Sequence, residues 1–162
     1  METQANVCVI TGGSSGMGFA AARAMGRKGY TLLLAARSPD KLDKAVATLT
    51  KEGITAQASR CDTGDWDSVQ ALANRAQSLG PVTAVLHIAG MSPHMGDAGA
   101  IMRGNALGTV HIHDAFYPVL APGGCLVDTS SMSAYLAPEF IMPRRAFRLA
   151  GSDREAFLKK MM

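Results

Sequence analysis

The sequence has 162 residues, of which 48% are hydrophobic and 18% charged, and its formal net charge is +3. This composition is typical of one globular domain and too apolar for a disordered chain. The basic residues form no long run, which argues against nucleic-acid binding. No apolar run is long enough to span a bilayer, and the polar N-terminus is unlike a signal peptide, so we expect no membrane span.

The cysteine and histidine residues do not suggest a metal site. Cys8, Cys61 and Cys125 are far apart in the sequence and include no Cys-x-x-Cys pair, which argues against zinc and against a disulfide framework. His111 and His113 are two apart on an expected helix and point to different sides. An odd number of thiols in or beside apolar stretches fits a reduced, cytoplasmic protein.

Strand-like and helix-like patterns alternate from the N-terminus. The strands are short apolar runs, and the helices carry apolar residues at three- and four-residue spacing. In chain order we expect a strand at 7–10, a helix at 16–28, a strand at 31–35, a helix from Pro39 after the N-cap Ser38 to the closing Gly53, and a strand at 54–59. A helix at about 65–79, a strand at 82–89, a helix at about 100–120, the turn 122–124 and a strand at 125–129 follow.

Beyond the fifth strand this rhythm stops. Residues 136–148 are expected to be a proline-punctuated loop with one helical turn, and 152–161 a short helix with Ser152 and Glu155 as a capping box. Alternating strands and helices indicate an α/β fold, a Rossmann-like doubly wound parallel sheet. By analogy with that fold, the strand order would be 3-2-1-4-5. We divide the chain into a dinucleotide-binding domain at 1–133 and a loop with a short helix at 134–162.

A glycine-rich turn follows the first strand and opens the first helix. Residues 11–18 read Thr-Gly-Gly-Ser-Ser-Gly-Met-Gly. Glycines allow the backbone to approach a pyrophosphate, and the helix N-terminus attracts its negative charge. No Lys-Ser or Lys-Thr follows the last glycine, which excludes a P-loop. The turn therefore predicts dinucleotide binding by Gly12, Ser14, Ser15, Gly16, Met17 and Gly18, although a tight turn without a ligand is the alternative.

The end of the second strand bears on the choice of dinucleotide. NAD-binding proteins usually have an acid here that binds the ribose 2′-hydroxyl, whereas this chain has Ala36 followed by Arg37. Arginine can pair with a 2′-phosphate, so we favour NADP(H) over NAD(H). Ser15 is not basic, so one common supporting charge is missing. Arg37 could otherwise cap a surface turn.

The spacing Thr-Gly-x-x-x-Gly-x-Gly resembles the short-chain dehydrogenase/reductase family. Asp62 resembles the family residue that contacts the adenine ring, although a position near a helix N-cap explains it equally well. Residues 87–90, His-Ile-Ala-Gly, resemble the family's Asn-Asn-Ala-Gly in Ala89 and Gly90 and depart from it in His87 and Ile88. The resemblance implies that Ala89 and Gly90 support the cofactor, and we interpret His87 as a structural residue.

Two further segments resemble catalytic motifs of the family. Residues 105–108 match its Asn-x-x-Gly, in which the asparagine supports a water in a proton relay, so the resemblance implies that role for Asn105. A helix asparagine bonded to backbone is the alternative. Ser131 matches the catalytic serine that bonds the substrate oxygen, and an ordinary serine-rich turn is its alternative.

The family's proton donor is a tyrosine with a lysine four residues later. Here Tyr30, Tyr117 and Tyr135 are followed at that spacing by leucine, alanine and glutamate. Residues 134–162 resemble an insertion that precedes the tyrosine in some relatives. The fifth strand would then be an unpaired edge, so we expect a marginally stable chain or a homo-oligomer.

The resemblance implies an NAD(P)-dependent oxidoreductase acting on a small-molecule ketone or secondary alcohol, present here as an incomplete chain. The missing tyrosine and lysine keep a non-catalytic dinucleotide-binding module as the alternative. A methyltransferase, whose fold also has a glycine loop, usually needs an acid where Ala36 and Arg37 stand.

Overall fold

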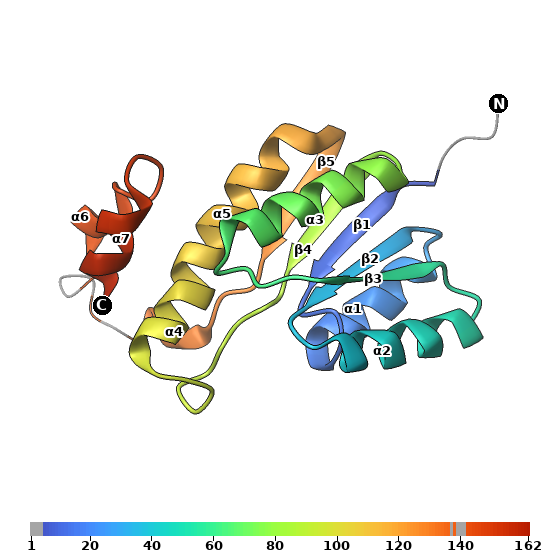
Figure 1. Ribbon diagram of the computed structural model, residues 1–162, viewed down its shortest axis with the longest axis horizontal. Helices are drawn as coiled ribbons and strands as arrows, with labels where there is room; N and C mark the ends of the chain where they lie inside the picture. Colours follow the sequence, from blue (N-terminus) through green and yellow to red (C-terminus); the bar gives the residue numbers. More distant parts are fainter. Residues whose placement is uncertain (1–4, 137, 139–141) are drawn as a thin grey trace.

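A computed structural model describes residues 5–136, 138 and 142–162. Its centre is a parallel sheet in the order β3-β2-β1-β4-β5, which confirms the predicted fold class and strand order. The sheet lies between two layers of helices (Figure 1). The strands are β1 (Val7–Thr11), β2 (Thr31–Ala36), β3 (Ala56–Arg60), β4 (Val82–His87) and β5 (Leu120–Asp128).

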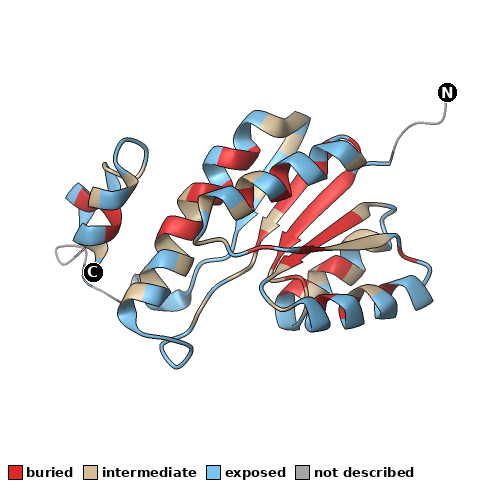
Figure 2. Cartoon of the chain, viewed as in Figure 1, coloured by how far each residue is buried: buried red, intermediate tan, exposed pale blue. Residues whose placement is uncertain are grey.

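Alternate residues of the central strand enter two separate cores. Val7 and Val9 pack with the helices α3 (Trp66–Leu79) and α5 (Gly108–Phe116). Cys8 and Ile10 pack with α1 (Gly16–Gly26) and α2 (Pro39–Lys51) on the other face. Because successive strand residues point to opposite faces, a strand covered on both sides must be apolar throughout. Figure 2 shows the buried residues along the inner strands and on the inward sides of these helices.

The helix expected over about 100–120 is not continuous. It consists of α4 (Ala98–Met102), the π-helical turn η1 (Arg103–Leu107), α5 and the 3₁₀ turn η2 (Tyr117–Val119). The π turn contains Asn105, whose backbone carbonyl accepts a hydrogen bond of 2.7 Å from the hydroxyl of Thr109. Single π turns within helices occur frequently at functional sites.

The edge strand β5 starts earlier than expected and includes residues 122–124, which the sequence predicted as a turn. Val82 pairs with Leu120 and Ala84 with Cys125, so the extra residues form an irregularity within the ladder. Gly123 adopts a φ of +79° there. Proline and glycine are tolerated at such a place because an edge strand has one side free of ladder bonds.

The C-terminal segment contains η3 (Met132–Tyr135), α6 (Arg144–Phe147) and α7 (Arg154–Met161). The loop predicted over 136–148 lies partly outside the described residues. The capping box predicted from Ser152 is wrong by one residue, since Asp153 is the N-cap and its carboxylate accepts the backbone N–H of Ala156. The boundary between the two predicted domains stays a prediction.

The helix α7 packs against η1, and its apolar cluster includes Val110 of α5. In Figure 1 the C-terminal helices lie to the left of the long helix that contains α4 and α5. Phe157 and Leu158 are buried there against Leu107. Arg154 adds polar contacts, since its guanidinium lies 4.1 Å from the ring centroid of Trp66 and 2.6 Å from a carboxylate oxygen of Asp114. The C-terminal segment therefore covers part of the long helix formed by α4, η1 and α5.

Candidate functional site: a cleft at the carboxyl ends of the strands

The glycine turn between β1 and α1 adopts backbone conformations that favour glycine. Gly12 and Gly16 have φ values of +69° and +54°, a region that residues with a Cβ rarely adopt. A Cβ on Gly16 would meet no atom within 4 Å, so this side of the turn is open. A Cβ on Gly18 would instead overlap the carbonyl of Gly12, so Gly18 allows the first turn of α1 to pack against the loop.

A cleft of about 320 Å³ opens where the carboxyl ends of β1, β2 and β4 meet the glycine turn. Parallel sheets of this kind bind ligands at that edge. Of the predicted cofactor residues, all except Gly16 line the cleft: Gly12, Ser14, Ser15, Met17, Gly18, Arg37, Asp62, Ala89 and Gly90. These predicted residues come from separate turns of the chain, and the fold brings them together on one continuous surface.

The cleft has a basic rim at the start of α2. Arg37 follows β2 and its side chain is exposed, with Nη1 lying 3.8 Å from the sulfur of Met91. Lys41, in the first turns of α2, lines the same cleft and also a second, shallower hollow beside Ser14 and Ser15. The sequence motifs did not include Lys41, although its position in the first turn of α2, three residues after the N-cap Ser38, could have indicated it.

Asp62, which follows β3, lines the same cleft. Its carboxylate accepts the backbone N–H of Gly64 at 2.9 Å, and its own N–H donates to the hydroxyl of Ser68. The N-cap of α3 is Asp65 and not Asp62. Asp62 therefore stabilises the turn before α3 while it lines the cleft.

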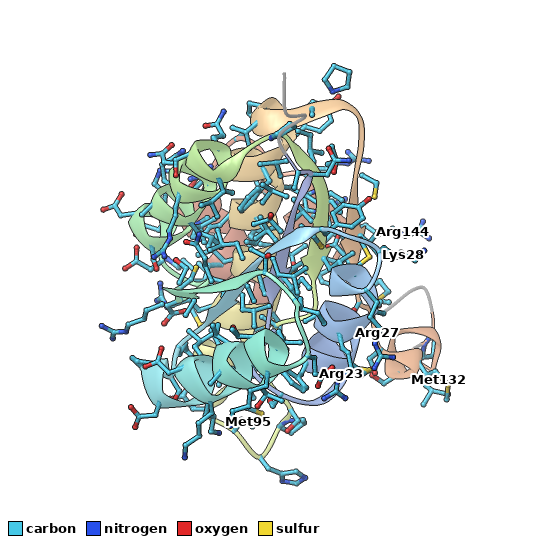
Figure 3. All side chains as sticks on the ribbon, turned by 90° about the vertical axis from the view of Figure 1, so that its right-hand side faces the viewer. Arg23, Arg27, Lys28, Met95, Met132 and Arg144 are labelled. Atoms are coloured by element: carbon cyan, nitrogen blue, oxygen red, sulfur yellow. The ribbon has the colours of Figure 1, made fainter. Side chains whose placement is uncertain are left out.

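Two methionines outside the predicted motifs, Met91 and Met95, also line the cleft. They belong to the loop between β4 and α4, and Met95 is 55% exposed. In the side view, Met95 lies at the lower end of the molecule (Figure 3). No local pattern predicts the place of these side chains, since it depends on how the loop returns across the sheet edge.

The floor of the cleft is a hydrogen-bonded network between β1 and β4. The hydroxyl of Thr11 accepts the backbone N–H groups of Ile88 and Ala89, both at 3.1 Å. The same oxygen lies 2.7 Å from Nδ1 of His87. Burial lowers the pKa of His87 below its usual value, more than the nearby carboxylate of Asp128 raises it.

The two predicted catalytic residues lie in different surroundings. Asn105 lines the cleft, and its side-chain amide exchanges two hydrogen bonds of 2.7 and 2.8 Å with the backbone of Met91. Ser131 is exposed, is not among the residues that line the cleft, and accepts hydrogen bonds from the N–H and hydroxyl of Ser133. Its neighbour Met132, 84% exposed, lies at the right-hand rim of the side view, away from Met95 (Figure 3).

Comparison with known proteins identifies the class to which this fold and cleft belong. A profile described as short chain dehydrogenase matches residues 6–142. The chain therefore belongs to the short-chain dehydrogenase/reductase family, as the glycine spacing predicted.

Individual relatives agree with this assignment. The chain is 30% identical over 140 residues to dehydrogenase/reductase SDR family member 4 of Bos taurus, a match that covers 80% of this chain and 50% of the relative. It is 32% identical over 149 residues to 1-deoxy-11-beta-hydroxypentalenate dehydrogenase of Streptomyces avermitilis, covering 84% and 55%. The chain thus spans about half the length of these relatives.

Solved structures resemble it as well. A short chain dehydrogenase/reductase from Burkholderia phymatum in complex with NAD has a TM-score of 0.75 and 29% identity, covering 85% of this chain and 53% of that one. An alcohol dehydrogenase from Thermococcus sibiricus complexed with 5-hydroxy-NADP has a TM-score of 0.71 and 27% identity, covering 96% and 65%. No helix among the described residues of our chain is long and apolar enough to cross a membrane.

Proposed function

We propose that this chain binds NAD(P) in the cleft and belongs to an oxidoreductase that transfers hydride between the nicotinamide and a small ketone or secondary alcohol. The observation that carries the proposal is the open glycine turn at the N-terminus of α1, beside a cleft at the carboxyl ends of parallel strands. The first turn of α1 has no acidic residue that would repel a diphosphate. Membership of the family supports the same reaction type.

Within this proposal, NADP(H) is the preferred cofactor. Arg37 and Lys41 place two cations at the rim where β2 ends, and Asp62 is the one acid that lines the cleft among the described residues. A 2′-phosphate adds negative charge that two cations favour and that an acid at the end of β2 would oppose. The similar structures were solved with NAD in one case and 5-hydroxy-NADP in the other, so they support either dinucleotide.

The nicotinamide, when bound, supplies or accepts the hydride. In our proposal the residues of this chain bind and orient the dinucleotide. Gly12, Ser14 to Gly18 and Arg37 hold the phosphates, and Asp62 faces the adenosine. Asn105 and Ser131 are the proposed catalytic residues, and Asn105 also fixes the loop at Met91.

A non-catalytic dinucleotide-binding module is the second candidate. It is favoured by the position of Ser131 outside the residues that line the cleft. Turnover of a ketone by the purified chain would eliminate it, whereas binding without turnover would support it.

Two broader proposals concern the environment of the chain. Association into a homo-oligomer is supported by β5, which ends the sheet and leaves Val127 49% exposed. A cytoplasmic location is supported by the three cysteines, which are all free thiols. Sedimentation analysis of the purified chain would test the first, and a sharp monomeric boundary would contradict it.

Calorimetric titration with NADPH and NADH tests the function directly. We expect binding of both, with NADPH tighter. Tighter binding of NADH would overturn the cofactor preference and keep the dinucleotide site. A well-folded chain that bound neither would contradict the proposed function.

A further inference from the structure

His87 occupies the end of β4, where the family pattern has an asparagine, and it is almost fully buried with 3% of its surface exposed. It pairs with Thr11 in the register of β1 and β4 and with Asp128 in that of β4 and β5. Each of its ring nitrogens has a polar neighbour. Nδ1 lies 2.7 Å from the hydroxyl oxygen of Thr11, and Nε2 lies 3.3 Å from that of Thr109.

These contacts determine which ring nitrogen carries the proton. The Thr11 hydroxyl has two lone pairs, and both are used to accept the N–H groups of Ile88 and Ala89. Its hydrogen is therefore donated to Nδ1 of His87, which must be unprotonated. The neutral imidazole then carries its proton on Nε2 and donates it to Thr109.

The network continues in the same direction on the helix. Thr109 donates its own hydrogen to the backbone carbonyl of Asn105 at 2.7 Å, which leaves its oxygen free to accept from His87. The side chain of Asn105 bonds both the N–H and the carbonyl of Met91. The segment from Ile88 to Met91 is thus held at one end by Thr11 and at the other by Asn105, and His87 joins the two.

This held segment is part of the cleft. Ala89, Gly90 and Met91 all line it. The backbone at Ala89 also lies directly beside Gly12, since a Cβ on Gly12 would come within 3.0 Å of the Ala89 nitrogen. A shift of the Ile88–Ala89 backbone would therefore disturb the glycine turn as well.

We propose that His87 is a positioning residue for the dinucleotide: its neutral imidazole, protonated on Nε2, holds the floor of the cleft in the conformation that binds cofactor. The inference rests on the proposed function. A doubly protonated ring would present a second N–H to Thr11, whose lone pairs are already occupied, so Thr11 would release Ile88 or Ala89. Cofactor affinity therefore falls when His87 is protonated.

The charged groups around the ring are compatible with a neutral state. Asp128 faces it from β5, but its carboxylate is bonded at 2.6 Å to His113, which extends from α5. On the β1 side the neighbour is the uncharged Thr11, and on α5 it is the uncharged Thr109. Burial opposes the charged ring, and the His113 charge acts in the same sense.

The test combines a spectroscopic and a binding measurement on the full 162-residue chain. In ¹⁵N NMR spectra at pH 7.5, without cofactor, we expect His87 to show a protonated Nε2 and an unprotonated Nδ1. A protonated Nδ1 would overturn the proposal whether or not the chain binds a dinucleotide. Absence of NADPH binding by a folded chain with the expected tautomer would instead contradict the proposed function, together with the role in binding assigned to His87.

The binding arm measures NADPH affinity between pH 5.5 and 8. We expect the wild-type affinity to fall on the acid side, by up to about tenfold per pH unit for one linked proton. His87→Gln, whose amide can accept from Thr11 and donate to Thr109 but does not titrate, should lack the His87-dependent part of this loss. His94→Gln, at an exposed histidine outside the residues that line the cleft, is the matched control and should retain it. Coincident profiles for wild type and His87→Gln would overturn the proposal.

A second pair of variants keeps the test decisive if His87→Gln does not fold. Thr109→Val removes the acceptor of the Nε2 proton and the donor to Asn105, and we expect about tenfold weaker NADPH binding at pH 7.5. Thr109→Ser keeps the hydroxyl and should restore the affinity. Equal binding by Thr109→Val and wild type would contradict the network.

Discussion

Gly18 packs against Gly12 so closely that a Cβ at position 18 would overlap the Gly12 carbonyl. The atoms it would meet are backbone, so they cannot move aside as the end of a flexible side chain could. The contact joins the first turn of α1 to the loop that borders the cleft. Gly18, the last glycine of the turn, is thus required by packing, whereas Gly16 has an open side.

Gly18→Ala should therefore destabilise the chain and weaken dinucleotide binding together. Overpacking of this kind costs about 1–3 kcal/mol. Urea unfolding followed by circular dichroism measures the stability, and calorimetry with NADPH the binding. Gly151→Ala is the control, because a Cβ there meets no atom within 4 Å, and it should change stability by less than about 0.5 kcal/mol. A Gly18→Ala chain as stable as wild type would contradict the packing.

The basic rim predicts a selective loss of NADPH affinity. Arg37→Gln and Lys41→Gln should each weaken NADPH binding about tenfold, the value of one charge-assisted hydrogen bond, and leave NADH binding nearly unchanged. Lys28→Gln removes an exposed positive charge outside the residues that line the cleft and serves as the control. Equal losses for NADPH and NADH in the two rim variants would show that the cations act on a part shared by both dinucleotides.

Stability should fall as the solution becomes mildly acidic. Burial lowers the pKa values of His87 and His111 below the usual 6.5, so the folded chain binds protons less readily than the unfolded chain. Above pH 6.5 both states are neutral and the effect vanishes. Below it the unfolded chain takes up protons first, so the free energy of unfolding decreases until the folded-state pKa values are passed.

Urea midpoints at pH 7.5 and 5.5 check this expectation. The midpoint should be lower at pH 5.5, and the difference should shrink in a chain carrying both His87→Gln and His111→Gln. A midpoint that rose on acidification would show that the buried histidines gain charge in the folded state.

Truncation of Phe157 should release α7 from the rest of the chain. This ring is buried against Leu107, and removing a buried phenylalanine side chain costs about 3 kcal/mol. Hydrogen exchange of residues 154–161 should then become roughly a hundredfold faster, while NADPH binding persists. Phe147→Ala, at a half-exposed ring on α6, is the matched control. Unchanged exchange in Phe157→Ala would contradict the packing of α7.

The sequence predicted the order of the elements because the buried strands and amphipathic helices have different apolar periods. It did not predict the π turn around Asn105, since one extra residue in a helix hardly alters an apolar pattern. Nor did it predict that residues 122–124 join β5, because a proline and two glycines on an edge strand look the same as a turn.

The candidate site was predictable to the extent that its residues lie in short motifs. Gly12, Arg37 and Ala89 each follow a strand, so the parallel topology brings them to one edge. Lys41 and Met91 reach the cleft through the packing of α2 and of the loop before α4, which no local pattern specifies. The network through His87 depends on the register of β1 and β4, and the sequence indicated only that this residue departs from the family pattern.

The most direct test of the central claim is an NMR titration of the ¹⁵N-labelled chain with NADPH. We predict that the largest amide shifts fall in the glycine turn, at Arg37 and Lys41, at Asp62 and along Ile88–Met91. Shifts concentrated elsewhere, or none in a well-folded chain, would contradict the assignment of this cleft as the dinucleotide site.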